Sequence, residues 1–324
     1  MFFVAPTYFP MSEATYLYQR KRVRNDREAT KGRKVEHKAM VMSLFTKDDK
    51  KAEASTGAAA NAAPRRRRLE GKAAIVTGAG SGIGRAAAIR MAEEGAKVCL
   101  VDLKERNAEA VEHIITAAGG EAIVADTDVS DPARVEAAIL SAVDAFGRLD
   151  VVFANAGING TMAPIETLTP EQWSHTLSTN LSGTFYIVKY AIPHLKEDGG
   201  SIVVTSSING NRKFKNFGGA AYSASKAAQV AFAKMAALEL AQYRIRVNAI
   251  CPGAIQTNIG ENTQQTDEVQ SIEIPIKYPK GSQPLAHRAG RPEQVADLVL
   301  FLACDESSHI TGTEVYIDGA ESLL

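Results

Sequence analysis

The sequence of 324 residues lacks the features that mark several classes of protein. Its three cysteines, Cys99, Cys251 and Cys304, lie far apart without a CxxC spacing, which argues against a disulfide framework or a zinc site. No run of about 20 apolar residues is present, so we expect no membrane span. The opening MFFVAPTYFP has no positive region before it and contains two prolines, which makes a poor secretory signal. We therefore expect a cytoplasmic protein with reduced thiols and no metal site.

The formal net charge is also zero, but basic and acidic residues are distributed unevenly between two parts of the sequence. Residues 1–68 hold 16 basic and 7 acidic side chains, which leaves 21 basic and 30 acidic ones for residues 69–324. The first part has no sustained apolar period and ends in the low-complexity run STGAAANAAPRRRR, so we expect a disordered basic tail. Such a tail can bind nucleic acid, an acidic partner or an import machinery. Its interspersed acidic residues favour a plain solvated tail, or an upstream extension with a later start at Met11, Met40 or Met42, and argue against a mitochondrial transit peptide.

From Lys72 onward, short apolar runs alternate with amphipathic stretches of helical length. Strands buried on both faces are expected at 73–77, 97–102, 122–126, 149–155, 201–207 and 245–251, and a final strand at 314–317. Helices are expected at 83–94, 105–118, 132–146, 170–196, 222–242 and 292–303. This alternation predicts a single α/β domain over residues 69–324, a doubly wound parallel sheet with helices on both faces. Ligands bind such sheets at the carboxyl ends of the strands.

A glycine-rich turn follows the first expected strand, with Gly78, Ser81, Gly82, Ile83 and Gly84 in the pattern TGxxxGxG. Glycines let the backbone turn tightly, let a pyrophosphate approach it, and let helix and strand pack closely. The amide groups at the start of the next helix then face the phosphates. Taken alone, the turn is also compatible with an ordinary tight turn or with the methyl-donor site of a methyltransferase.

Asp102 ends the second expected strand, 20 residues after Gly82, where a carboxylate can accept hydrogen bonds from the adenosine ribose. The same carboxylate would repel a 2′-phosphate, and position 81 is a serine instead of a cation, so NAD is favoured over NADP. Lys104 and Arg106 follow closely and could soften this preference.

Tyr222 and Lys226 lie four residues apart at the start of a strong helical segment, so they share one face. A lysine cation near a tyrosine favours the phenolate, and we expect it to lower a pKa that is normally about 10. Such pairs are common by chance on helix surfaces. Here, however, Ser206-Ser207, Asn155-Ala156-Gly157, Pro252-Gly253 and the glycine turn are all expected at the same edge of the sheet.

On these motifs the sequence from Leu69 to Leu324 resembles the short-chain dehydrogenase/reductase family, in its single-domain Rossmann-fold branch. The resemblance implies that Tyr222 is the general acid/base, that Lys226 assists it and binds the nicotinamide ribose, and that Ser207 holds the substrate oxygen. Asn180 would kink a helix and hold a water in the proton relay, or simply cap a helix. The remaining cofactor contacts implied by the resemblance are Asp128, Val129, Asn155, Ala156, Gly157, Pro252, Gly253, Ile255 and Thr257.

The function expected from this resemblance is hydride transfer between NAD and a small alcohol or ketone. An NADP-dependent 3-oxoacyl reductase and a non-catalytic dinucleotide sensor are the alternatives. The Ser207 to Tyr222 loop is two residues longer than usual and carries Arg212, Lys213 and Lys215, which would admit an anionic substrate or form a solvated loop, and the second is favoured. Residues 258–290 correspond to a variable substrate lid. We expect no nucleic-acid partner and a homotetramer or homodimer.

Overall fold

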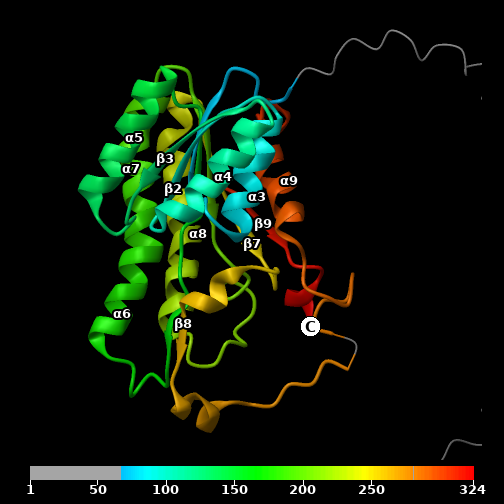
Figure 1. Ribbon diagram of the computed structural model, residues 1–324. Coiled ribbons are helices and arrows are strands. Elements are labelled where there is room, and N and C mark those ends of the chain that lie inside the picture. Colours follow the sequence, from blue (N-terminus) through cyan, green and yellow to red (C-terminus); the bar gives the residue numbers. More distant parts are fainter. Residues whose placement is uncertain (1–66, 280) are drawn as a thin grey trace, which may run out of the picture. The chain divides into compact units, whose positions relative to one another are not determined.

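The computed structural model describes residues 67–279 and 281–324 (Figure 1). The predicted tail therefore lies outside the described residues except for Arg67 and Arg68. Arg68 donates hydrogen bonds from its guanidinium to Glu306, at 2.6 Å, and to the sulfur of Cys304, at 3.3 Å. The described body thus begins slightly before the boundary expected at residue 69.

A parallel sheet of seven strands forms the centre of the described residues. The strands are β1 Ala73–Thr77, β2 Lys97–Asp102, β3 Glu121–Asp126, β4 Val151–Ala154, β6 Gly200–Thr205, β7 Ile245–Pro252 and β9 Glu314–Ile317. Their spatial order is β3-β2-β1-β4-β6-β7-β9, and every neighbouring pair is parallel. The order reverses between β1 and β4, and this is where such sheets bind ligands.

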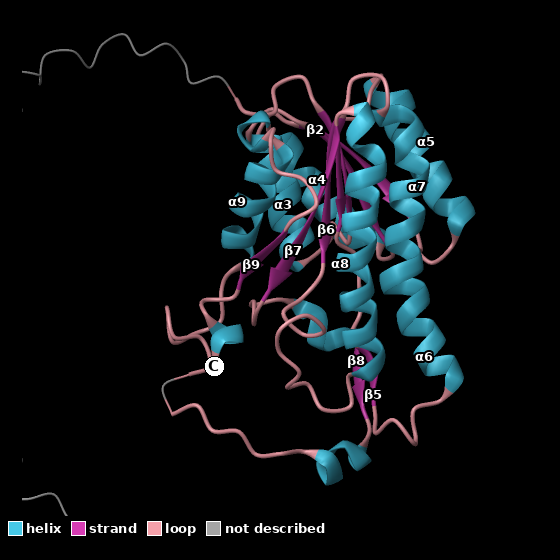
Figure 2. Cartoon of the chain, turned by 180° about the vertical axis from the view of Figure 1, so that it is seen from behind, coloured by secondary structure: helices cyan, strands magenta, loops and turns pink. Residues whose placement is uncertain are grey.

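Two sets of three helices cover the two faces of the sheet (Figures 1 and 2). One face carries α5 Pro132–Phe146, α7 Gly183–Leu195 and α8 Ala220–Leu240, and the other carries α3 Gly82–Glu93, α4 Glu105–Ala117 and α9 Pro292–Ala303. Alternate strand residues serve alternate faces: Ile75 belongs to the first core and Val76 to the second. The predicted three-layer Rossmann architecture is confirmed.

The sequence supplies the helix start signals that the structure uses. Asp131 accepts hydrogen bonds from the amides of Ala133 and Arg134 at the start of α5, where Pro132 is the first helical residue. Thr169 and Gln172 form a capping box at the start of α6, Pro170–Leu177. These local signals explain why the predicted starts of both helices agree with the structure.

Two expectations about the sheets were incomplete. Strand β3 was expected to be buried on both faces, but only Ala122 of its six residues is buried, because β3 is the edge strand and lacks a neighbour on one side. A second, two-stranded parallel sheet was not predicted; it joins β5 Gly160–Met162 to β8 Thr263–Gln265. Strands of three residues carry too short a pattern to recognise from sequence.

The expected single helix over 170–196 is interrupted. It consists of α6, a π-helical turn at Ser178–Ser182, and α7. A π-turn places one extra residue in a helical turn and occurs often at functional sites. Asn180 stands at the centre of this turn.

The helices of the described residues are each too short or too polar to cross a membrane. The thiols of Cys99, Cys251 and Cys304 are all buried and free.

Candidate functional site

A cleft of about 680 Å³ opens at the carboxyl ends of the strands, beside the reversal of strand order. The turns after β1, β2, β3, β4, β6 and β7 all contribute to its wall. Every predicted cofactor residue lines this cleft except Gly84, and every predicted catalytic residue lines it except Asn180.

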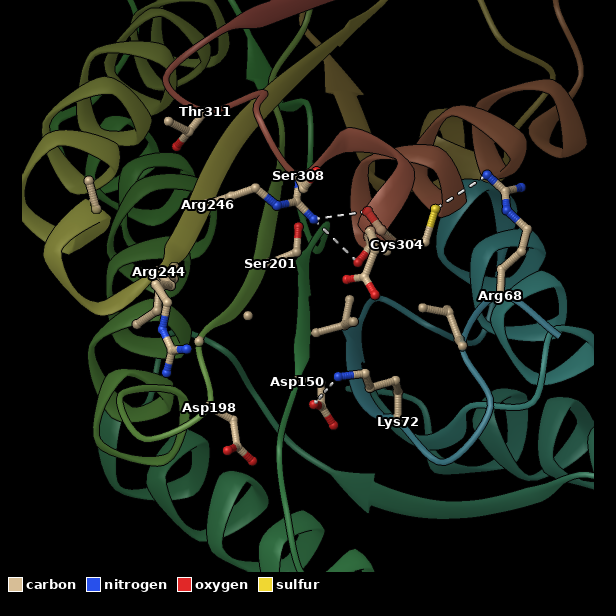
Figure 3. A pocket seen from close by; sticks show the side chains of 18 residues that line it. Arg68, Lys72, Asp150, Asp198, Ser201, Arg244, Arg246, Cys304, Ser308 and Thr311 are labelled. Carbon is tan, nitrogen blue, oxygen red and sulfur yellow. Dashed lines mark hydrogen bonds and ion pairs between the residues drawn. The ribbon is translucent and has the colours of Figure 1, made fainter. Parts of the chain in front are cut away.

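A second cavity of about 430 Å³ lies at the opposite, amino ends of the strands (Figure 3). Its basic side chains are engaged within the chain. Arg246 donates to the carbonyl oxygens of Leu302 and Cys304 at the end of α9, and Lys72 pairs with Asp150 at 3.1 Å. Arg246 thus neutralises the dipole at the carboxyl end of α9, and Lys72 neutralises the buried Asp150, so both side chains have a structural explanation.

The glycine turn after β1 has the geometry that a dinucleotide requires. Gly78 and Gly82 adopt positive φ angles of 65° and 51°, which other residues rarely adopt. A Cβ on Gly84 would lie 2.1 Å from the carbonyl oxygen of Gly78, so this glycine lets α3 pack against the turn. Ser81, at the N-cap of α3, makes no side-chain capping bond, and the first amides of that helix are left for a ligand.

Polar groups after β2 and β3 complete the cofactor half of the cleft. The Asp102 carboxylate accepts hydrogen bonds from the amides of Gly80, at 2.8 Å, and Lys104, at 2.9 Å. These bonds fix the carboxylate at the cleft wall, beside the Lys104 side chain. Asp128 accepts from Ser130, and Val129 is 7% exposed.

The Asn155-Ala156-Gly157 segment links three strand ends. The Asn155 side chain donates to the carbonyl oxygen of Thr77, at 3.0 Å, and accepts from the Thr205 hydroxyl, at 3.1 Å. Gly157 lies where a Cβ would come 3.1 Å from the Asn180 Oδ1 atom and 3.5 Å from the Lys226 Nζ atom. A side chain at position 157 would therefore crowd two predicted catalytic residues.

Helix α8 brings Tyr222 and Lys226 to the cleft wall, 9% and 3% exposed. The Lys226 Nζ atom lies 5.6 Å from the centre of the Tyr222 ring and donates to the carbonyl oxygen of Thr205, at 2.8 Å. Ser207 lies close enough to the Tyr222 phenol to act on its pKa, and both residues line the cleft. The neighbouring Ser206 hydroxyl instead donates to the carbonyl oxygen of Lys226, at 2.7 Å, which favours Ser207 as the serine that meets a ligand.

Burial has the largest effect on the pKa values of Tyr222 and Lys226. It raises the pKa of Tyr222 above its usual value, although the hydrogen bond to Ser207 acts in the opposite direction. It also lowers the pKa of Lys226 to about 8. We expected Lys226 to lower the pKa of Tyr222, but the protein groups by themselves raise it. Both side chains are removed from water, and this opposes a charge on either one.

Asn180 is fully buried and lies behind the cleft wall. Its side chain accepts from the amide of Ile158, at 2.8 Å, and donates to the Ile158 carbonyl oxygen and the Ser225 hydroxyl. Its own carbonyl oxygen accepts from Thr184 and Gln229. Asn180 is thus no helix cap, since it sits inside the π-turn and holds the chain after β4 in place.

The end of β7 and the loop after it form another part of the cleft wall, with Pro252, Gly253, Ile255 and Thr257. The Thr257 side chain faces Gly82, since a Cβ there would lie 3.2 Å from it. Thr257 and the start of α3 therefore bound the same part of the cleft.

The basic insertion between Ser207 and Tyr222 was expected to be a solvated loop, and this is wrong. Lys215 forms an ion pair with Glu321, which is fully buried near the carboxyl end of the chain. Lys213, 8% exposed, donates to the carbonyl oxygen of Glu321, at 2.8 Å. The Arg212 guanidinium lies 3.5 Å from the centre of the Tyr316 ring.

Glu321 also accepts from the amide of Ala254, at 2.9 Å, and the side chain of Gln283, at 3.1 Å. Burial alone would raise its pKa, but the hydrogen bonds from Lys215, Ala254 and Gln283 hold that pKa below the ordinary value. Glu321 lines the cleft, and nothing in its sequence surroundings pointed to it. It joins the insertion, the loop after β7 and the lid segment around Gln283.

Known proteins match this chain over nearly all of its described residues. A family profile described as Enoyl-(Acyl carrier protein) reductase matches residues 78–320. Levodione reductase of Leifsonia aquatica is 36% identical over 258 residues, which cover 79% of this chain and 96% of that protein.

Two solved structures show the same similarity. A 3-ketoacyl-ACP reductase from Sinorhizobium meliloti 1021 is 47% identical, with a TM-score of 0.75, over 78% of this chain and 99% of the other. A 3-ketoacyl-(acyl-carrier-protein) reductase from Brucella melitensis, complexed with NADH, is 33% identical, with a TM-score of 0.69, over 78% and 99%. The chain belongs to the short-chain dehydrogenase/reductase family and is an NAD(P)-dependent oxidoreductase that interconverts alcohols and carbonyl compounds.

Proposed function

We propose that this protein is an NAD-dependent dehydrogenase/reductase in which Tyr222 moves the proton and Ser207 holds the substrate oxygen. The observation that carries the proposal is the convergence at one cleft wall of the Tyr222 phenol, the neighbouring Ser207 hydroxyl and the Lys226 amine 5.6 Å from the ring centre. The glycine turn borders the same cleft.

The cofactor, when bound, supplies or accepts the hydride at the substrate carbon. Ser207 donates a hydrogen bond to the substrate oxygen and orients it toward Tyr222. In the reductive direction the Tyr222 phenol gives its proton to that oxygen, and in the oxidative direction the phenolate takes it back. Lys226, held by the Thr205 carbonyl, places a positive charge near the phenolate, while Asn180 positions the backbone behind it. The cofactor contacts predicted from the sequence for residues that line the cleft are part of this proposal.

A conservative substitution tests the assignment of the acid/base. Tyr222→Phe removes one hydroxyl and should abolish turnover, with NADH affinity changed less than about threefold, because the phenol acts in proton transfer. Tyr243→Phe, on the 3₁₀ turn after α8 and outside the cleft, is the matched control and should keep full activity. Normal turnover by Tyr222→Phe with an alcohol that the protein oxidises would refute the assignment.

The preference for NAD rests on Asp102. Its carboxylate is fixed by two amides at the cleft wall, where it can accept from ribose hydroxyls and repels a 2′-phosphate. An NADP-dependent 3-oxoacyl reductase is the second candidate, favoured by the Lys104 side chain at the same wall and by the name of the Sinorhizobium relative. Titrations with NADH and NADPH decide between them: we expect at least tenfold tighter NADH binding. A non-catalytic dinucleotide sensor is disfavoured because it needs no Ser207, Tyr222 and Lys226 together.

We also propose a homo-oligomer, a tetramer or a dimer. Helices α7 and α8 expose large apolar side chains on one side of the body: Phe185 is 44%, Met235 56% and Leu238 74% exposed. A second copy of the same surface would cover them. Light scattering after size exclusion measures the subunit number, and a Leu238→Lys variant should lower it.

We propose a cytoplasmic location, because three free thiols fit the reducing cytoplasm, and cell fractionation tests this.

A further inference from the structure

We propose, building on the function above, that the substrate end of the cleft accepts a neutral polyhydroxylated alcohol, and that the Asn209 amide binds the hydroxyl next to the reacting carbon. Asn209 is thus assigned as a residue that determines substrate specificity. Three observations carry the proposal: the side chains of the wall, the unpartnered side-chain oxygen of Asn209, and the neutralised charge of Lys215.

The wall beyond Ser207 is rich in carboxamide side chains. They come from the chain after β4, the loop after β6 and the lid: Asn159, Asn209, Asn216, Asn258, Asn262 and Gln264. Each carboxamide offers both donors and acceptors. A purely apolar substrate would remove these groups from water without replacing their hydrogen bonds, which costs free energy, whereas a substrate with several hydroxyls replaces them.

Asn209 stands out among these side chains because it is buried, 8% exposed, and unsatisfied. Among the residues that the structure describes, its Oδ1 atom is buried and has no hydrogen-bond partner. A buried polar group without a partner is costly, so a site with one is matched to a ligand that supplies it. A hydroxyl both donates and accepts, and it can therefore pair with either end of the amide.

The position of Asn209 relates that hydroxyl to the reacting carbon. Its backbone amide donates to the Ser207 hydroxyl oxygen, at 3.1 Å, and Ser207 lies beside the Tyr222 phenol. Asn209 is therefore next to the pair that holds the reacting oxygen. A substrate group that pairs with its side chain therefore lies close to that oxygen along the substrate, as the second hydroxyl of a vicinal diol does.

The charges at this end of the cleft favour a neutral substrate. Besides the catalytic Lys226, Lys215 lines this end, and its charge is already paired with the buried Glu321. Glu261, also in the wall, adds a negative charge. Apart from the catalytic Lys226, a carboxylate or phosphate on the substrate would meet no unpaired lysine or arginine among the described residues of this end of the cleft, so the anionic substrates that the basic insertion suggested are not favoured.

Matched alcohols test the proposal. We would measure kcat/KM for cyclohexane-1,2-diol and for cyclohexanol, which lacks the neighbouring hydroxyl, with NAD⁺, and extend the series to ribitol. The diol should be favoured by about tenfold or more, since an unsatisfied polar group discriminates against the analogue that cannot pair with it. A 3-hydroxybutyryl thioester is included as an anion-free acyl substrate of the alternative class.

Variants of Asn209 connect this preference to the residue. Asn209→Leu keeps the size but loses the hydrogen bonds, and the diol to cyclohexanol ratio should fall about tenfold or more. Asn209→Asp keeps the acceptors and should retain most of the ratio. Gln270→Leu, at an exposed lid position outside the cleft, should leave the ratio unchanged. Melting temperatures identify any variant that has lost its fold, and the Asp variant then decides.

The outcomes separate this inference from the proposed function. A wild-type ratio within twofold of unity, or a ratio that Asn209→Leu does not change, overturns the inference. Turnover of cyclohexanol or the thioester without turnover of the diols overturns it and leaves the proposed function intact. A protein that binds NADH but turns over none of the substrates contradicts both.

Discussion

The buried Glu321 carboxylate offers the sharpest test of how the cleft is held together. It accepts from Ala254 and Gln283, pairs with Lys215, and is fully buried. Glu321→Gln keeps the shape of this side chain but replaces one acceptor oxygen with an NH₂ group. Since all three partners are donors, at least one of them must then face another donor.

The expected cost follows from these contacts. Removing one partner of a buried ion pair costs about 3 to 5 kcal/mol. The Lys215 side chain is 25% exposed, so water compensates part of its loss, and we expect the lower end, about 3 kcal/mol. For a domain of this size, about 1 kcal/mol shifts the melting temperature by roughly 2 to 4 °C, which predicts a decrease of roughly 6 to 12 °C.

Differential scanning fluorimetry at pH 7 measures this decrease. Glu121→Gln, which breaks a surface pair between Lys97 and Glu121 with side chains 39% and 53% exposed, is the control and should change the melting temperature by less than about 2 °C. If Glu321→Gln lowers the melting temperature by no more than this control does, the reasoning is refuted.

The difference between wild type and Glu321→Gln should also depend on pH. The folded-state pKa of Glu321 is lowered, so its contribution is fully present above the unfolded value of about 4.5 and is lost as the pH falls through the folded pKa. The two melting temperatures should therefore converge in acid, if both proteins still unfold reversibly there.

Three further variants test other parts of the site. Lys226→Met should lower turnover at least 100-fold. It should also raise the melting temperature at pH 7, because the lowered pKa of Lys226 means that its positive charge destabilises the folded state. This increase in melting temperature should shrink as the pH rises from about 8 to 10.5. Gly84→Ala should destabilise by about 2 kcal/mol or more and weaken NADH binding, since its Cβ would lie 2.1 Å from the Gly78 carbonyl, whereas Gly260→Ala, with open space around it, should be neutral. Asp102→Asn removes the charge that repels a 2′-phosphate and should raise the NADPH to NADH affinity ratio about tenfold or more, measured by fluorescence titration.

The fold was predictable because its signals are local and repeated. Each inner strand is a short apolar run, and each helix has one apolar stripe, so the pattern of the chain specifies the layers. The exposure of β3 was not predictable in the same way. The run AIVAD resembles the runs of the inner strands, and its edge position depends on the order of strands in the sheet, which no local pattern encodes.

The residues of the candidate site differ in the same way, according to whether their surroundings are encoded by a local pattern. Residues in motifs, such as Gly82 and Tyr222, could be predicted to line the cleft because their spacing is fixed by a turn or by a helical face. Glu321 was missed because its partners lie at Lys215, Ala254 and Gln283, on three separate segments. For the same reason the charge of Lys215 looked free in the sequence and is neutralised in the fold.

Asn180 was expected to kink a helix, and the structure shows the form that this kink takes. The expected uninterrupted helix would have one residue fewer in the turn that the structure makes π-helical at Ser178–Ser182. That turn directs the Asn180 amide to both backbone groups of Ile158, directly after Gly157, whose missing side chain leaves room beside Lys226. The irregular turn, the glycine and the lysine therefore depend on one another: restoring a regular helix would withdraw the amide that holds the chain after β4, and that chain forms the cleft wall between the cofactor half and Asn209.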